Sequence, residues 1–511
     1  MNTRAPLLSR QWNFRTALKK RVEIRINSPA TTRSYMSSNQ ASEGTAGVGL
    51  PSNAPFVRSS LSDRERRMLA AEESVVVPHE LMKRMSDARR RSDALFSLVR
   101  AGSLYERPIP ERNRIIFYVG HLEAFDWNLL SERAFGLKSV HPDYDRLFAF
   151  GIDPVGGGLP TDLPSDWPSV DAVRDYVGNI RCALDQRLEK AVLEPHSATG
   201  NGFPLSTLLN VAVEHRLMHA ETLAYMLHQL PLDMKVRERD SPDLAGPPIA
   251  HRMVPVPAGV VTMGLSRGSE SFGWDNELAA HEVEVPAFEI DRYKVTSRQY
   301  LEFMSAGGYE THAFWDDDEW EWKTGHEISH PLFWKQQDNQ WFYRTMFNEV
   351  PLPLDWPLYV SHAEAMAYSR WAGKSLPTEA EWQRAAYGTL DGQTRTYPWG
   401  NEMPESSLGN FDFHRWDPMP VNSLPEGQSA FGIHDILGNG WEWTSTVFGP
   451  FPGFEPFPFY RGYSADFFDG RHFVMKGGSA RTAACMLRGT FRNWFQAHYQ
   501  YVYAGFRCVR R

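Results

Sequence analysis

Residues 214–221 have the sequence Glu-His-Arg-Leu-Met-His-Ala-Glu and lie in a segment without glycine or proline, residues 205–230. Residues four apart on an α-helix project from one face, so His215 and His219 can point at a common atom. A helix can supply two imidazoles to a metal in this way. Glu221 lies roughly 200° round the helix from His219, so we expect a structural role for it rather than metal binding. Two histidines in a helical core would give the same pattern, and the pair alone leaves both interpretations open.

The N-terminal half has the pattern of a helical bundle. Apolar residues recur at three- and four-residue spacing in four segments, which are separated by turn-forming stretches. We expect helices near residues 79–101, 112–134, 169–192 and 205–230. Together they predict an up-down four-helix bundle over residues 61–231, and facing helices of such bundles commonly hold metals.

A third ligand for such a metal would have to come from another helix. His121 lies on the apolar side of the second expected helix and is the best candidate. Taken alone, His121 is more readily an ordinary buried histidine. In one bundle with the His-x3-His pair, it more readily completes a metal site.

Composition excludes several classes of partner. The 511 residues carry 54 basic and 62 acidic side chains, a net charge of −8, without a basic block in the folded part, so we expect no nucleic-acid partner. The apolar fraction is 42%, and no apolar run approaches the ~20 residues that span a bilayer, so we expect no membrane association. Three cysteines make no disulfide framework and favour a reducing, cytoplasmic location. The oligomeric state stays open.

Residues 1–60 differ from the rest of the chain. They contain few apolar clusters and end in a Ser/Gly/Ala/Pro mixture, so we expect an extension that is disordered or serves in targeting. The first 22 residues are basic without an acidic residue, as in transit peptides, which makes an organelle the alternative location. An overlong start, with Met36 as the functional initiator, is the other interpretation.

The C-terminal half follows a linker at residues 232–250 and has a different pattern. Short β-like runs alternate with turns and long loops over residues 251–511, which predicts an α+β domain. We expect two helices in it, near residues 361–371 and 378–387. Thr378 starts the second and has Glu381 three residues on, which is a capping box. The acidic run at residues 316–319 is interpreted as a solvated loop.

Seven short segments follow one another in this half and carry a family resemblance. They are residues 257–264, 290–296, 371–382, 397–400, 437–444, 476–479 and 505–507. Together they resemble the formylglycine-generating-enzyme/sulfatase-modifying-factor family, whose fold is C-type-lectin-like. The resemblance is specific for the fold and says little about chemistry.

A DinB-like four-helix bundle with a His-x3-His-x-Glu helix, followed by such a domain, resembles the non-haem iron sulfoxide synthases of ergothioneine and ovothiol biosynthesis (the EgtB and OvoA types). The resemblance covers residues 61–511 and implies that His121, His215 and His219 bind Fe(II). Three imidazoles leave positions open for substrate and O₂. In this family, the enzyme forms a C–S bond on the imidazole ring of hercynine, the trimethylated betaine of histidine, using a thiol donor and O₂.

The segment Phe491-Arg492-Asn493-Trp494 is similar to a substrate-binding segment of that family. The resemblance implies that Asn493 and Trp494 hold the carboxylate of hercynine, with Arg492 beside them. An amide can donate to a carboxylate, and an aromatic face suits a quaternary ammonium. A structural asparagine and a core tryptophan are the alternative interpretation.

Three positions depart from the sulfoxide synthases. Their tyrosine at the oxygen step falls here on Phe448 or Phe451, and a phenyl ring can donate no proton, so the catalytic residue is unknown. Phe495 stands where relatives carry an acidic group for the amine of γ-glutamylcysteine, and Met218 replaces a polar residue. These departures argue against γ-glutamylcysteine as the donor.

The departures favour a related branch, the selenoneine synthases (SenA type), which join a selenosugar to hercynine. A selenolate forms at lower pH and is oxidised more easily than a thiolate, so its site could work without the tyrosine. The aromatic stretch at residues 448–463 could stack on a sugar, although core packing explains the same rings.

Other functions remain open. An ergothioneine-type sulfoxide synthase would use a thiol such as γ-glutamylcysteine or cysteine. A thiol dioxygenase would oxidise the sulfur itself, and a non-catalytic ligand-binding module could hold structural zinc on three histidines. A formylglycine-generating oxidase is disfavoured because Cys485 and Cys508 make no evident copper-binding pair.

Overall fold

The computed structural model describes residues 63–149, 159–193, 203–238, 242, 244–246 and 249–511. The expected extension at residues 1–60 and part of the expected linker therefore lie outside the described residues. The fold class is the expected one: a helical N-terminal part is followed by a part with several small sheets. None of the helices in the described ranges has the length and apolar content to cross a bilayer.

Within the described residues, four long helices and one short helix form the N-terminal part. They are α2 (Asp63–Ser97), α3 (Ile115–Leu130), α4 (Pro142–Leu147), α5 (Val170–Leu193) and α6 (Leu205–Gln229). The four long helices confirm the expected ones, but α2 begins well before residue 79. Helix α3 passes into a π-helical turn at Ser131–Phe135, which ends at Gly136 with a left-handed φ of 60°.

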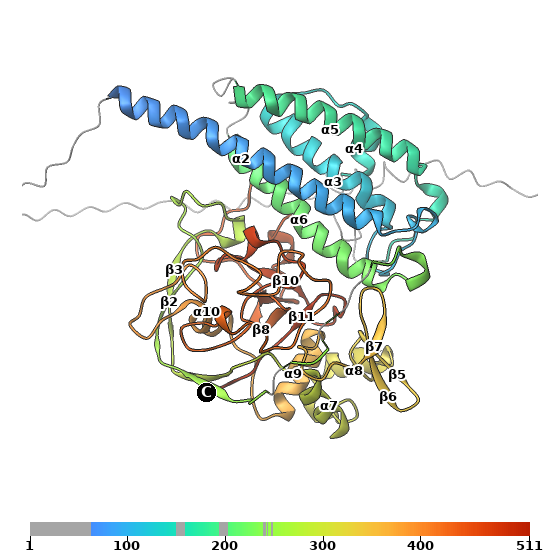
Figure 1. Ribbon diagram of the computed structural model, residues 1–511, viewed down its shortest axis with the longest axis vertical. Coiled ribbons are helices and arrows are strands. Elements are labelled where there is room, and N and C mark those ends of the chain that lie inside the picture. The colour runs from blue at the N-terminus through green and yellow to red at the C-terminus, as the bar shows by residue number, and fades with distance from the viewer. Residues whose placement is uncertain (1–62, 150–158, 194–202, 239–241, 243, 247–248) are drawn as a thin grey trace, which may run out of the picture.

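Helix α6 lies between the other helices and the C-terminal domain (Figure 1). Its residues are buried without interruption from Val211 to Leu217 and again from His219 to His228. A helix that is buried nearly all round has neighbours on every side. Residues of α6 can therefore face the bundle core and the second domain at the same time.

A buried charge cluster joins the four long helices. Glu123 on α3 lies 3.0 Å from Arg216 of α6, 2.7 Å from Arg181 of α5 and 3.8 Å from Arg89 of α2. Burial disfavours the charged form of Glu123, but the three guanidinium groups lower its pKa to about 2. Arg216 also donates to Asp126 and to the carbonyl of Leu122. The cluster fixes α6 against α3, and these two helices carry the three candidate histidines.

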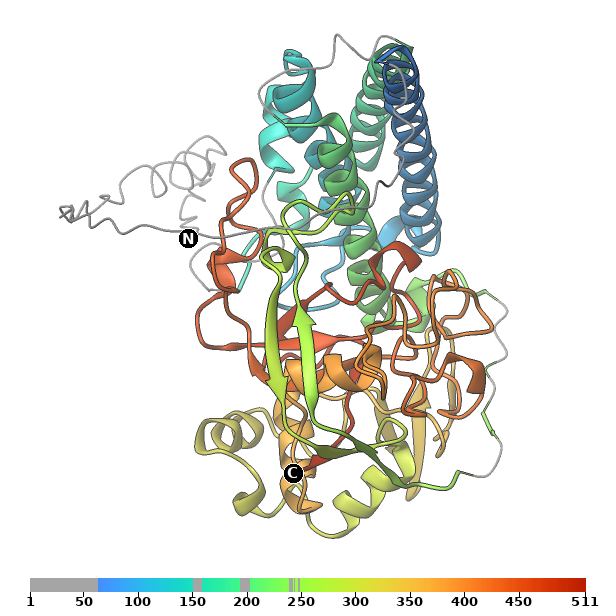
Figure 2. The same cartoon turned by 90° about the vertical axis from the view of Figure 1, so that its left-hand side faces the viewer.

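The C-terminal domain contains four small sheets. The sheet beside the site has the order β10-β9-β8-β11, formed by β8 (Trp441–Val447), β9 (His472–Lys476), β10 (Asn493–Gln496) and β11 (Ala504–Gly505). A second sheet, β1-β4-β12, is formed by β1 (Met253–Val256), β4 (Phe288–Asp291) and β12 (Val509–Arg510). A third contains β5 (Trp334–Gln337), β6 (Gln340–Arg344) and β7 (Glu349–Pro351). The fourth is a hairpin of β2 (Gly259–Met263) and β3 (His281–Val285), whose connecting loop reaches the bundle (Figure 2).

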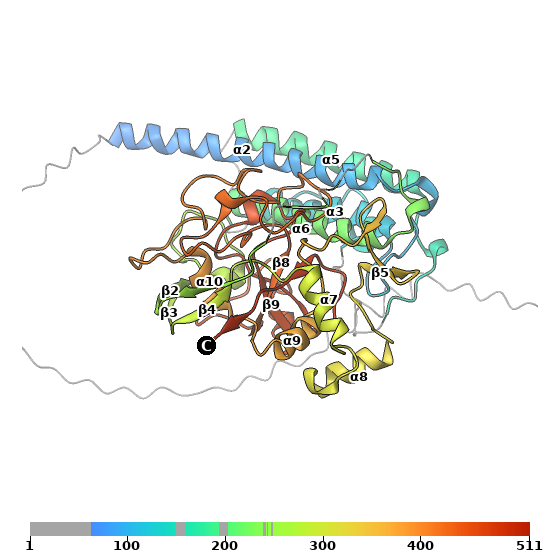
Figure 3. The same ribbon diagram turned by 60° about the horizontal axis from the view of Figure 1, so that its bottom comes forward.

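Two of the helices in this domain were expected from the sequence, and two were not. Helices α9 (His362–Trp371) and α10 (Glu379–Tyr387) confirm the two expected ones, and the Thr378 side chain caps α10 as its capping box predicts. Helices α7 (Ser297–Ser305) and α8 (Asp317–Gly325) were not expected. With α9 they lie on the side away from the bundle (Figure 3). The interpretation of residues 316–319 as a loop was wrong, because this run begins α8.

Candidate metal centre

Three histidine side chains meet in the bundle core. The Nε2 atom of His219 lies 3.1 Å from that of His215 and 3.3 Å from that of His121. Two ligands at about 2.1 Å from one metal lie about 3.0–3.4 Å apart at right-angled to tetrahedral geometry, so the spacing fits a shared metal. Each histidine is at most 3% exposed. The two separate helices bring together the three residues that the sequence analysis singled out.

Burial keeps the three imidazoles neutral, and a hydrogen bond orients the ring of His121. The Nδ1–H of His121 donates to the carbonyl of Phe148 over 2.7 Å, which leaves its Nε2 lone pair for the centre. Burial lowers the pKa of His121 to about 4, with Arg216 acting in the same direction. Burial and the neighbouring histidines place the pKa values of His215 and His219 well below 6.5. Three neutral nitrogen donors suit a transition metal such as iron, zinc or copper.

Aromatic rings close the centre within the bundle. Phe125 stacks on His215 with ring centroids 3.4 Å apart and planes at 11°. Phe117 stacks on His121 at 4.8 Å and 19°. These rings hold the imidazoles in place and keep water away from that side.

Rings of the C-terminal domain reach the histidines from the other side. The ring of Tyr460 lies 6.2 Å from that of His215 and 5.6 Å from that of Tyr463. Tyr463 is 5.4 Å from Trp494 in an edge-on arrangement, and its hydroxyl donates to the sulfur of Met218 over 3.4 Å. The expected substrate residue Trp494 is thus linked to the centre by two tyrosine rings.

The phenylalanines at the expected tyrosine position lie elsewhere. Phe448 stacks on Trp494 at 4.2 Å, and Phe451 lies under the guanidinium of Arg492 at 4.0 Å. The alignment of the family's tyrosine with Phe448 or Phe451 stays a prediction, and Tyr460, nine residues after Phe451, brings a tyrosine ring to 6.2 Å from that of His215. The position of Tyr460 does not follow from a short sequence motif, because the chain takes an irregular path from Gly449 to Tyr460.

The remaining expected substrate residues have different surroundings. The side-chain oxygen of Asn493 accepts from the backbone N–H of Trp494 at 2.9 Å, which leaves its NH₂ group as the donor. Arg492 is buried and paired with Glu379 at 2.8 and 3.0 Å, so contact with substrate would require breaking this ion pair. Phe495 stacks on Tyr499 at 4.9 Å, with the guanidinium of Arg112 at 5.8 Å from its ring.

Two carboxylates of α6 bind the C-terminal domain. Glu221 accepts from Trp441, Ser479 and Thr482 at 2.8, 2.5 and 2.8 Å, in agreement with the structural role expected for it. Glu214 pairs with Arg488 at 2.8 Å. Arg488 is not predictable from the sequence, because no local pattern distinguishes it from other arginines.

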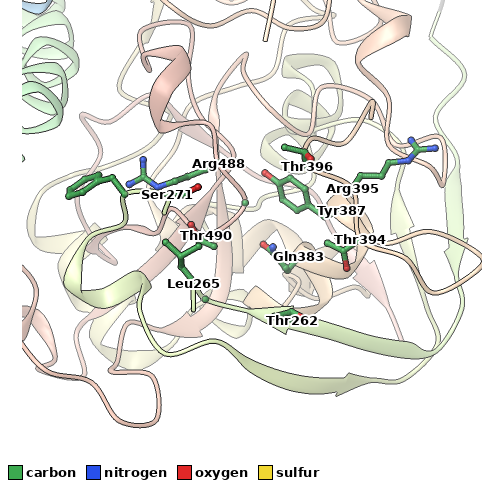
Figure 4. Close-up of a pocket in the computed structure, with 13 residues that line it drawn as sticks. Thr262, Leu265, Ser271, Gln383, Tyr387, Thr394, Arg395, Thr396, Arg488 and Thr490 are labelled. Atoms are coloured by element: carbon green, nitrogen blue, oxygen red, sulfur yellow. The ribbon is translucent and has the colours of Figure 1, made fainter. Parts of the chain in front are cut away.

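A separate pocket of about 270 Å³ lies in the C-terminal domain (Figure 4). Gln383 and Tyr387 of α10 line it together with Thr262, Thr490 and Arg488. None of the three histidines lines it, so it is distinct from the metal centre.

Comparisons with known proteins match both parts of the chain. Residues 84–223 match the DinB superfamily, and residues 243–511 match the sulfatase-modifying factor enzyme 1-like domain.

The hercynine oxygenase of Mycolicibacterium thermoresistibile is 32% identical over 444 residues, which cover 85% of this chain and 95% of that protein. The hercynine oxygenase of Mycolicibacterium smegmatis is 34% identical over 376 residues, with 72% and 83% covered. Ergothioneine biosynthesis protein 1 of Neurospora crassa is 28% identical over 491 residues, with 80% of this chain and 55% of that protein covered. With its two domains in this order and near-complete overlap with the first of these relatives, the chain belongs to the hercynine oxygenase family.

Proposed function

We propose that the chain is an Fe(II)- and O₂-dependent enzyme that forms a carbon–selenium or carbon–sulfur bond on the imidazole ring of hercynine. The observation that carries this proposal is the convergence of three neutral imidazole nitrogens beneath Tyr460 and the Tyr463–Trp494 pair. The family relatives named hercynine oxygenase support hercynine as the substrate.

Each part of the site has a role in this proposal. His121, His215 and His219 would hold the iron, which supplies O₂ activation and oxidation of the chalcogen when bound. The Asn493 NH₂ group would donate to the carboxylate of hercynine, and the Trp494 ring would face its quaternary ammonium. Phe125 and its neighbouring rings exclude water, which strengthens these contacts in a low-dielectric site.

For the donor, the chain offers apolar surroundings. Phe495 packs on Tyr499 and Met218 accepts from Tyr463, so neither supplies a counter-charge to a free ammonium group. This lining favours a selenosugar over γ-glutamylcysteine. A bound sugar could also stack on the rings of residues 457–464, the aromatic loop.

Tyr460 favours a second candidate, an ergothioneine-type sulfoxide synthase that uses a thiol donor. Its ring lies nearest to His215 among the tyrosines of that loop whose contacts are described. A phenol can hold and donate a proton at the oxygen step, which a thiolate reaction needs more than a selenolate reaction.

Reconstitution separates these candidates. The protein is loaded with Fe(II) without oxygen, given hercynine and one of a selenosugar, γ-glutamylcysteine or cysteine, and then exposed to O₂ before mass analysis. A selenium adduct that forms with the selenosugar alone supports a selenium donor. Adducts with sulfur donors alone establish the second, and O₂ uptake without any hercynine adduct contradicts both.

Substitution of Tyr460 by phenylalanine tests the proton role. We expect Tyr460→Phe to slow adduct formation with a thiol donor on the order of 10²-fold, the usual contribution of a positioned acid. With a selenium donor we expect a much smaller effect. Tyr397→Phe, which removes a hydroxyl from a ring stacked on Trp399, is the control. Equal loss in both variants would remove Tyr460 from the mechanism.

A further inference from the structure

A four-residue segment connects the histidine helix to the aromatic loop. Trp274 precedes the 3-10 helix Asp275–Glu277, which lies in the loop between β2 and β3. The aromatic loop is residues 457–464 and contains Tyr460 and Tyr463. Segment 274–277 touches α6 on one side and this loop on the other.

Trp274 bridges the two elements directly. It is 1% exposed, and its ring stacks on Tyr463 at 3.9 Å and 24°. Its indole N–H donates to the carboxylate of Glu214 at 2.8 Å, and Glu214 precedes His215 on α6. The position of Tyr463 is thereby set relative to the histidine helix.

Asp275 holds the two ends of the aromatic loop. One carboxylate oxygen accepts from the backbone N–H of Phe457 at 3.3 Å, and the other accepts from the Ser464 hydroxyl at 2.5 Å. Asp275 is fully buried, so both bonds are shielded from water. The Asp275 side chain thus fixes the distance between Phe457 and Ser464, which are seven residues apart in the sequence.

Glu277 anchors the segment itself. It accepts from the backbone N–H of Trp274 at 3.0 Å and from Arg488 at 2.5 and 2.7 Å. Arg488 also pairs with Glu214 at 2.8 and 3.0 Å. This Glu277–Arg488–Glu214 series closes a second connection between the segment and α6.

We propose that Trp274 and Asp275 are positioning residues for the reaction, which set the distance of Tyr460 and Tyr463 from the three histidines. The inference rests on the proposed function and deepens it. Among the described contacts, neither residue has a hydrogen bond or a ring contact with a histidine. A displacement of about 1 Å at reacting groups can lower turnover on the order of 10²-fold, so a rigid loop matters for the rate.

Hydrogen exchange of the metal-free protein tests the contact independently of catalysis. The amides of Tyr460 and Tyr463 donate within the loop, to Phe457 and Tyr460, and report its order. We expect Asp275→Ala and Trp274→Leu to speed exchange of these amides about tenfold or more. The conservative variant Asp275→Asn keeps one acceptor, and Trp274→Phe keeps a stacked ring. We expect amide exchange in these two variants to be slower than in Asp275→Ala and Trp274→Leu but faster than in the wild type.

Matched controls separate positioning from general damage. Trp382 is also fully buried and donates to a carboxylate, Glu442, so Trp382→Phe removes the same kind of bond away from the loop. Asp469→Ala removes a carboxylate that holds the turn just after the loop. We expect neither control to change exchange at Tyr460 or Tyr463.

Turnover with hercynine and the active donor completes the test. We expect kcat to fall on the order of 10²-fold in Asp275→Ala, with a change in KM of less than about tenfold and partial rescue in Asp275→Asn. Unchanged loop exchange in both Asp275→Ala and Trp274→Leu would overturn the inference. Faster exchange in these variants together with a kcat equal to that of Trp382→Phe would overturn it as well. A wild-type protein without turnover would count against the proposed function alone, and the exchange results would still decide whether the segment holds the loop.

Discussion

At the scale of single residues, the candidate metal centre depends on histidines that stay neutral. Burial lowers the pKa of His121 from 6.5 to about 4. As pH falls, His121 therefore binds a proton at a higher pH in the unfolded chain than in the folded protein. Its contribution to stability is present above pH 6.5 and is lost as the pH falls from 6.5 to 4. We expect the metal-free protein to lose roughly 3 kcal/mol through His121 alone over this range, because each tenfold change in an acid constant corresponds to about 1.4 kcal/mol.

Urea unfolding of the metal-free protein at a series of pH values measures this loss. His121→Gln should show a shallower decline than the wild type, since glutamine does not titrate. His312→Gln, which changes an exposed histidine, should decline like the wild type. A wild-type unfolding midpoint that does not move between pH 6.5 and 4 would contradict the prediction.

The same residues show what the sequence can and cannot reveal. His215 and His219 are predictable from their spacing, and His121 from its place on the apolar side of a facing helix. Tyr460 is not predictable in this way, because its position follows from the path of an irregular loop. That path depends on Trp274 and Asp275, which are nearly 200 residues away in the sequence.

At the scale of elements, Arg216 links the two helices that carry the histidines. Replacing Arg216 by Met would leave Glu123 and Asp126 with less compensation in a buried site. Breaking such a buried ion pair typically destabilises by about 3–5 kcal/mol. Arg146→Met removes an exposed pair with Asp143, for which about 1 kcal/mol or less is expected. Equal urea midpoints for the two variants would show that the charge cluster contributes little.

Helix boundaries illustrate the limits of local patterns. Thr378 with Glu381 and Asp316 with Glu319 have the same cap spacing, and both pairs begin helices. Only the first was interpreted correctly, because three consecutive aspartates in the second run favoured a solvated loop. Its helix is supported by tertiary contacts, including the ion pair of Arg370 on α9 with Asp316. Such contacts are not visible in a local window of sequence.

At the scale of the whole molecule, the candidate metal ligands belong to one domain and the expected substrate residues to the other. Glu221 joins them, and Glu221→Ala would leave Trp441, Ser479 and Thr482 without their acceptor. We expect destabilisation of about 1–3 kcal/mol or more, together with loss of turnover, because unpaired buried donors are unfavourable and the two halves of the site separate. Metal affinity, measured by Co(II) titration, should stay within a few-fold, since all three ligands lie on α3 and α6. Glu189→Ala, an exposed change on α5, should alter neither quantity. Loss of Co(II) binding in Glu221→Ala would instead mean that the C-terminal domain is needed to assemble the three histidines.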